Sequence, residues 1–419
     1  MRKLYTVIVA LAAVVLTATA AGIWCHRIIE QNKMQTEDRE SSDLEEAKQK
    51  DDQDEDNQEL RQLSEEEERK SRSEEILASM TLEEKVAQLF IVTPEGLTGF
   101  STVTEAGTAT QNAINQYPIG GFIYMEQNLQ TPEQVRKMIE NAQAYSHERV
   151  GLPLFINVDE EGGTVTRFGN NPNFSLGKIS TMQEIGATGD AKNAYDVGIR
   201  IGSFLHELGF NMNNAPDADV LTNPANTVIG SRSFGTDCNL VSDMVLSEMN
   251  GLEEQMVIPV LKHFPGHGAT EADTHQGYAY TTKTLDELMS NELIPFINGI
   301  NAGAEVIMAA HISCPNIIGD DTPTSLSKIM LTDILRGQLG YQGIIITDAL
   351  NMGAIAEEYT SAQATVLALQ AGADILLMPE SFQESYAGIL EAVNSGTLTE
   401  DRINESVKRI IDLKLSIEE

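Results

Sequence analysis

The chain has 419 residues, of which 63 are Asp or Glu and 28 are Lys or Arg, so its formal net charge is −35. A surface this acidic repels the phosphate backbone of nucleic acids, and we therefore expect no nucleic-acid partner. The length permits one large domain or two ordinary ones. The three cysteines, Cys25, Cys238 and Cys314, are too few for a disulfide framework.

The first apolar run, Tyr5 to Trp24, follows the basic residues Arg2 and Lys3. It is about 20 residues long, which is enough to cross a bilayer. Basic residues before such a run fit either an uncleaved anchor or a secretory signal peptide. We favour a membrane anchor over residues 1–33, with signal cleavage near Ala20 as the alternative. Both interpretations place the rest of the chain outside the cytoplasm.

Residues 34–75 are rich in Glu, Asp, Gln, Lys, Arg and Ser and have almost no large apolar side chains. Such a segment cannot bury enough surface to offset its ordering entropy. We expect a disordered or transiently helical acidic tether, and a partner-binding acidic tail is the alternative. The folded domain is then predicted to cover residues 76–419.

From Thr81 onward, short apolar runs alternate with amphipathic stretches, and the first helix opens with a capping box of Thr81 and Glu84. The predicted strands are 90–93, 121–124, 154–158, 211–214, 258–261, 306–309, 343–346 and 374–377. The predicted helices include 132–147, 191–208, 240–254, 286–302, 327–339, 361–371, 382–395 and 400–415. Eight strands separated by helices favour one (β/α)₈ barrel, of the TIM type, with a doubly wound sheet as the alternative.

The barrel hypothesis directs attention to the residues that follow the strands, because barrel sites lie at the carboxyl ends of the strands. Asp159 follows the third strand, Lys262 and His263 follow the fifth, and Asp348 follows the seventh. Carboxylates, cations and imidazoles at one rim, with no phosphate-binding glycine loop, suit a neutral polar ligand such as a sugar. Alone, Asp348 would more simply be read as a helix cap.

The loop after the fifth strand is rich in glycine and histidine and ends with Asp273, Thr274 and His275. A carboxylate two residues from an imidazole can fix its tautomer and raise its basicity, which is the arrangement that a general acid/base needs. A zinc site made from His263, His267, Asp273 and His275 is the alternative. Their spacing matches no common zinc signature and Lys262 would oppose a cation, so we expect neither a metal nor another cofactor.

Four motifs in this order resemble glycoside hydrolase family 3, in particular its single-domain bacterial β-N-acetylhexosaminidases. The motifs are Asp159-Glu160-Glu161-Gly162-Gly163 with Arg167, Arg232-Ser233-Phe234-Gly235, Lys262 to Gly268 with Asp273-Thr274-His275, and Thr347 to Met352. The resemblance covers about Met80 to Leu415.

The resemblance implies a retaining exo-β-N-acetylglucosaminidase. It would act on terminal N-acetylglucosamine of glycans derived from peptidoglycan or chitin. Asp348 would be the nucleophile, and His275, oriented by Asp273, the acid/base. The sugar would be held by Asp159, Arg167, Arg232, Lys262 and His263. We expect a monomer that binds carbohydrate and contacts the membrane only through its N-terminal segment.

The catalytic loop departs from the family pattern at two positions, where Ala269 replaces an Asp and Thr274 replaces a Ser. Thr274 keeps the hydroxyl, but Ala269 removes a carboxylate, which puts the behaviour of the loop in question. Two further functions stay open on the sequence. One is a phosphorylase that uses the same site, and the other is a catalytically silent cell-wall-binding protein.

Overall fold

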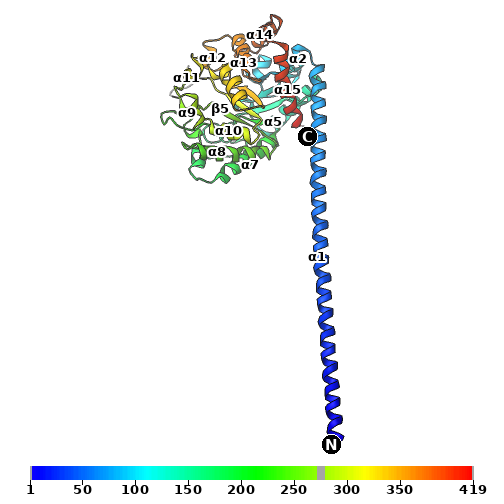
Figure 1. The fold of residues 1–419 in the computed structure, drawn as a ribbon. Helices are drawn as coiled ribbons and strands as arrows, with labels where there is room; N and C mark the ends of the chain where they lie inside the picture. Colours follow the sequence, from blue (N-terminus) through cyan, green and yellow to red (C-terminus); the bar gives the residue numbers. More distant parts are fainter. Residues whose placement is uncertain (1, 271–278, 418–419) are drawn as a thin grey trace. The chain divides into compact units, whose positions relative to one another are not determined.

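The computed structural model describes residues 2–270 and 279–417. It contains two compact units, Met1–Lys70 and Ser71–Glu419 (Figure 1).

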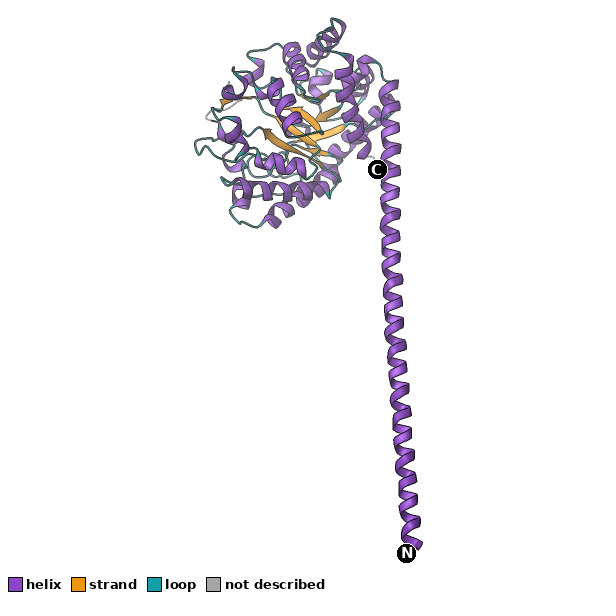
Figure 2. Ribbon diagram, viewed as in Figure 1, coloured by secondary structure: helices purple, strands orange, loops and turns teal. Residues whose placement is uncertain are grey.

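The first unit belongs to one long helix, α1 (Arg2–Ser79). Its part from Leu4 to Thr36 is long and apolar enough to cross a membrane, a property that anchors and signal peptides share. The acidic stretch after it is also helical, where we expected a disordered or transiently helical tether (Figure 2). The helix has a physical reason: between Met34 and Ser79 the chain contains no Pro or Gly and many strong helix formers, including Glu, Gln, Lys and Arg.

The second unit is built on an eight-stranded sheet in which every pairing is parallel. The strands are β1 (Phe90–Val92), β2 (Gly121–Ile123), β3 (Phe155–Val158), β4 (Met212–Asn213), β5 (Ile258–Phe264), β7 (Val306–Ala309), β9 (Ile344–Thr347) and β10 (Leu376–Leu377). Their order is β10-β1-β2-β3-β4-β5-β7-β9. A parallel bridge between Ile346 and Ile375 joins the two ends of this order, so the sheet is a nearly closed barrel. The predicted (β/α)₈ architecture is confirmed.

Helices surround the strands (Figure 2). The main ones are α2 (Leu82–Gln88), α4 (Thr108–Gln116), α5 (Pro132–Val150), α7 (Ala191–Leu208), α8 (Cys238–Glu253), α9 (Leu285–Met289), α10 (Ile294–Asn301), η5 (Ile329–Gln338), α13 (Ser361–Ala371), α14 (Phe382–Asn394) and α15 (Glu400–Ser416). The predicted helix over 286–302 is in fact two helices, α9 and α10. Pro295 lies in the first turn of α10, where a missing N–H group is tolerated and where a new helix can begin.

The end of α1 contributes to the packing of the second unit. Ser73 is fully buried, and Ile76 and Leu77 pack against the hydrophobic core. Thr81 then caps α2 through the expected capping box with Glu84. A truncation that preserves this packing must therefore keep the residues from Ser71 onward.

Candidate active site

A cavity of about 320 Å³ opens at the carboxyl ends of the barrel strands. Six residues that we predicted from the sequence line it together: Asp159, Arg167, Arg232, Lys262, His263 and Asp348. They come from segments that follow β3, β4 and β9 and from β5 itself. Apolar side chains complete the wall, among them Met125 after β2 and Met308 on β7.

Asp348 directly follows β9 and is held by the barrel backbone. Its N–H group donates to the carbonyl of Ala309 at 2.9 Å, and its Oδ1 accepts the N–H of Ala349 at 2.8 Å. Burial acts to raise the pKa of Asp348, but His311, His263, the Ala349 N–H and Lys262 together lower it below the usual value. The carboxylate is therefore ionised at neutral pH, as a nucleophile requires.

His311 is a site residue that we did not select from the sequence. It is fully buried after β7, with Nδ1 2.7 Å from Ser325 Oγ and Nε2 2.9 Å from the carbonyl oxygen of Ala349. These contacts fix the ring beside the backbone of Asp348, and His311 is the largest influence that lowers the pKa of that carboxyl group. Its position directly after a predicted buried strand was the available signal.

Asp159 is oriented by three partners. Arg167 Nη2 donates to Oδ2 at 2.9 Å, Asn214 Nδ2 donates to Oδ1 at 2.9 Å, and Lys262 Nζ lies 3.9 Å from Oδ1. A carboxylate that is fixed in this way can accept two hydrogen bonds from neighbouring sugar hydroxyls without reorganising.

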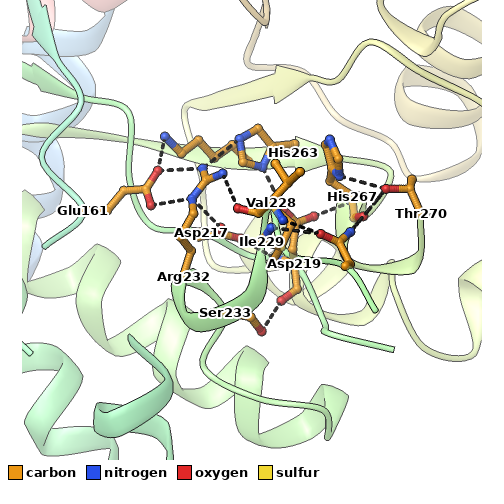
Figure 3. Close-up of polar contacts among 12 residues, drawn as sticks. Glu161, Asp217, Asp219, Val228, Ile229, Arg232, Ser233, His263, His267 and Thr270 are labelled. Atoms are coloured by element: carbon orange, nitrogen blue, oxygen red, sulfur yellow. Dashed lines mark hydrogen bonds and ion pairs between the residues drawn. The ribbon is translucent and has the colours of Figure 1, made fainter. Parts of the chain in front are cut away.

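Glu161 forms the buried centre of the ionic network (Figure 3). Arg232 donates to both of its oxygens, Nε to Oε2 at 2.9 Å and Nη2 to Oε1 at 2.8 Å, and Lys262 Nζ lies 2.5 Å from Oε1. Although burial raises the pKa of Glu161, Arg232 and Lys262 lower it to about 2. We had noted Glu161 only as part of a motif, although it is the residue that positions both predicted cations.

His263 is held between Asp219 and Arg232 (Figure 3). Nδ1 lies 2.7 Å from Asp219 Oδ2, and Nε2 lies 3.2 Å from Arg232 Nη2. A guanidinium can only donate, so Nε2 accepts this hydrogen bond and Nδ1–H donates to Asp219. The other oxygen of Asp219 accepts the N–H of His267 at 2.5 Å. The imidazole of His263 is thereby fixed as part of the cavity wall.

Asp217, Asp219 and His263 bring possible metal ligands within 4.8 Å of one another. However, the polar atoms of Asp219 and His263 are already used in the contacts above, and Arg232 Nε lies 3.5 Å from Asp217 Oδ2. Burial and the neighbouring Asp219 raise the pKa of Asp217 well above its usual value, which favours a protonated carboxyl group. These groups therefore fit an ion-pair network better than a metal site.

The predicted acid/base pair, Asp273 and His275, lies in 271–278, outside the described residues. The structure describes both flanks. On one side the helical turn η3 (His267–Ala269) is followed by Thr270, which is fully buried. On the other side is the short strand β6 (Ala279–Tyr280), which pairs with β8 (Ile312–Ser313).

Comparisons with known proteins agree with this geometry. The profile of the glycosyl hydrolase family 3 N terminal domain matches residues 81–413. The chain is 35% identical over 326 residues to β-hexosaminidase A of Pseudoalteromonas piscicida, with 73% of this chain and 54% of the relative covered. It is 31% identical over 350 residues to β-hexosaminidase LpqI of Mycobacterium tuberculosis, with 81% of this chain and 84% of the relative covered.

Among solved structures, a family 3 β-N-acetylglucosaminidase from Paenibacillus sp. has a TM-score of 0.76 and 35% identity over 81% of this chain and 64% of its own. The chain thus spans about half of the Pseudoalteromonas relative and somewhat less than two thirds of the Paenibacillus chain. The family match covers the whole barrel and every residue described at its cavity. The chain belongs to glycoside hydrolase family 3.

Proposed function

We propose that the protein is a retaining exo-β-N-acetylglucosaminidase. The observation that carries this proposal is the ionised Asp348 at the cavity, facing a rim of fixed carboxylates and cations that suits sugar hydroxyls. The names of the relatives, β-hexosaminidase and β-N-acetylglucosaminidase, support the choice of an N-acetylated amino sugar.

In the first step, an Asp348 oxygen attacks the anomeric carbon of a terminal β-linked sugar. The bond from that carbon to the leaving oxygen breaks, and His275 gives this oxygen its proton. The product is a covalent glycosyl ester of Asp348. In the second step, His275 takes a proton from water, whose oxygen attacks the same carbon and releases Asp348. Asp273 orients the imidazole in both steps.

Substrate recognition is assigned to the other residues of the cavity. Asp159 accepts hydroxyl hydrogen bonds, and Lys262 and Arg167 donate to sugar oxygens from positions set by their carboxylate partners. Arg232 and His263 act mainly through the buried network, which keeps this rim rigid. Such preorganisation lowers the cost of reaching the transition state.

The apolar part of α1 supports a location outside the cytoplasm, as a membrane anchor or as a signal peptide. Glycans that carry terminal N-acetylglucosamine, derived from peptidoglycan or chitin, are the substrates that we propose for this location.

Hydrolysis of p-nitrophenyl N-acetyl-β-glucosaminide, followed by proton NMR, tests the proposal directly. We expect release of the β-anomer first, because two inversions at one carbon retain its configuration. Matched assays with the β-glucoside should show a much lower kcat/KM. Initial release of the α-anomer would refute the double displacement, and absence of any turnover would favour the silent wall-binding protein.

A further inference from the structure

A second cavity is formed by the end of α3 (Pro94–Thr98), the loop after it and the first turn of α4, in the segment that follows the carboxyl end of β1. Its volume is about 300 Å³, and the described residues that line it all lie between Thr98 and Thr110. Five of the lining residues are threonines, one is the exposed Phe100 and one is the exposed Glu105, and no Lys or Arg lines the cavity in the described part of the chain. Hydroxyls, a carboxylate and an aromatic ring without a cation suit a neutral sugar and disfavour an anion.

Two side chains of this cavity lack the internal contacts that a purely structural loop would give them. Phe100 is 57% exposed, although a phenyl ring gains free energy from burial. Thr110 is 3% exposed and lines the cavity, yet its hydroxyl has no hydrogen-bond partner among the described residues. The carbonyl of Ala106, its natural partner one helical turn earlier, is already bonded to Asn141 and Tyr145. The hydroxyl oxygen keeps accessible surface at the cavity, where water or a ligand hydroxyl can bond to it.

Asn128 forms hydrogen bonds to the walls of both cavities. Its Oδ1 accepts the N–H of Met125, which lines the active site, at 2.8 Å. Its Nδ2 donates to the carbonyl of Val103, which lines the second cavity, at 2.8 Å, and to Glu95 Oε1 at 2.7 Å. The second cavity is therefore fixed relative to the wall of the first.

We propose that the Thr98–Thr110 cavity is a subsite for the leaving-group part of the glycan, in which a neutral sugar packs on Phe100 and hydrogen-bonds to Thr110. This inference rests on the proposed function. It also selects among substrates: Glu105 would repel the carboxylate of a muramic acid, so neutral N-acetylglucosamine oligomers are preferred over muramic-acid-containing fragments.

The test compares substrates of different length in the full chain. For the wild type, kcat/KM should rise from the N-acetylglucosamine dimer to the tetramer. Phe100→Ala should lower kcat/KM for the tetramer about 10-fold, mainly through KM, because an aromatic contact and its buried area are lost. Thr110→Val should have a similar but smaller effect, about 5-fold. Both variants should retain wild-type turnover of the p-nitrophenyl monosaccharide, which does not reach the subsite.

Met289→Ala is the matched control, since Met289 is also a large exposed apolar residue (37%) but belongs to α9. It should leave both substrates unchanged. No chain-length dependence in the wild type, or equal losses for the tetramer and the aryl substrate in Phe100→Ala, would overturn the subsite. Wild-type inactivity on the aryl substrate would instead refute the proposed function.

Discussion

Glu248 on α8 is buried to 1% exposure behind the ionic network, and neither of its carboxyl oxygens has a hydrogen-bond partner among the described residues. Burial, and then the charge of Glu161, raises its pKa from 4.5 to about 8, although Lys262 opposes the shift. We predict that Glu248→Gln stabilises the protein at alkaline pH, because the amide cannot ionise.

The sign follows from proton linkage. Between pH 4.5 and about 8 the folded state binds a proton at Glu248 that the unfolded state has released, so stability falls as pH rises through this window. Each pKa unit corresponds to about 1.36 kcal/mol, so the full penalty above pH 8 is about 5 kcal/mol. For a unit the size of Ser71–Glu419 this is about 7 °C in Tm.

The assay is thermal unfolding of the wild type and of Glu248→Gln at pH 5 and at pH 9. The two proteins should have similar Tm values at pH 5, where Glu248 is protonated, and the variant should have the higher Tm at pH 9. Asp243→Asn is the matched control, because Asp243 is an exposed carboxylate on the same helix. Equal Tm differences at both pH values would show that Glu248 is not a neutral buried acid.

Three further predictions concern the reaction and the chain ends. Asp348→Asn should keep the wild-type Tm within a few degrees and lower turnover by about 1,000-fold or more, since both steps need the carboxylate. Near-normal turnover would show that Asp348 serves only as a helix cap. His275→Ala should slow hydrolysis of a natural disaccharide by about 10²–10⁴-fold but spare the glycosylation step of a substrate with a dinitrophenyl leaving group. Azide should restore the second step of this variant, and Asp273→Asn should show the same pattern more weakly. Equal losses for both substrates without rescue by azide would refute the acid/base role. Deleting residues 1–70 should leave Tm and aryl turnover unchanged, and a large loss of either would show that this segment supports the barrel.

The barrel could be predicted from the sequence because the barrel strands are buried on both faces. Continuous apolar runs such as Ile344–Ile346 and Val306–Ala309 can be recognised without tertiary information. Helix ends were also accessible where a cap or a glycine marks them, as in α7 between Asp190 and Gly209. The split between α9 and α10 was missed because the apolar pattern continues across it.

The location of the site could be predicted from the sequence, but the pairing of its side chains could not. A position after a strand identifies the residues at the rim, and Asp159, Lys262 and Asp348 were found in this way. It does not show which side chains neutralise one another. Glu161 looked like one acidic residue among three, and only the fold shows that it holds two cations. Ion-pair geometry of this kind depends on tertiary distances, which periodicity does not contain.

The pairing of charges in the cavity favours water over phosphate as the acceptor of the sugar. Among the described residues, each Arg or Lys that lines it is already matched by a carboxylate: Arg167 by Asp159, and both Arg232 and Lys262 by Glu161. A phosphate acceptor would have to compete with these carboxylates for the cations. Its negative charge would also approach the carboxylate that Asp348 regains when it leaves the anomeric carbon. Water carries no such penalty. We therefore expect free N-acetylglucosamine as the main product even in about 50 mM phosphate, with the product ratio measured by NMR. A main product of N-acetylglucosamine 1-phosphate would show that the site contains a cation free to bind phosphate, and would replace the hydrolase by a phosphorylase.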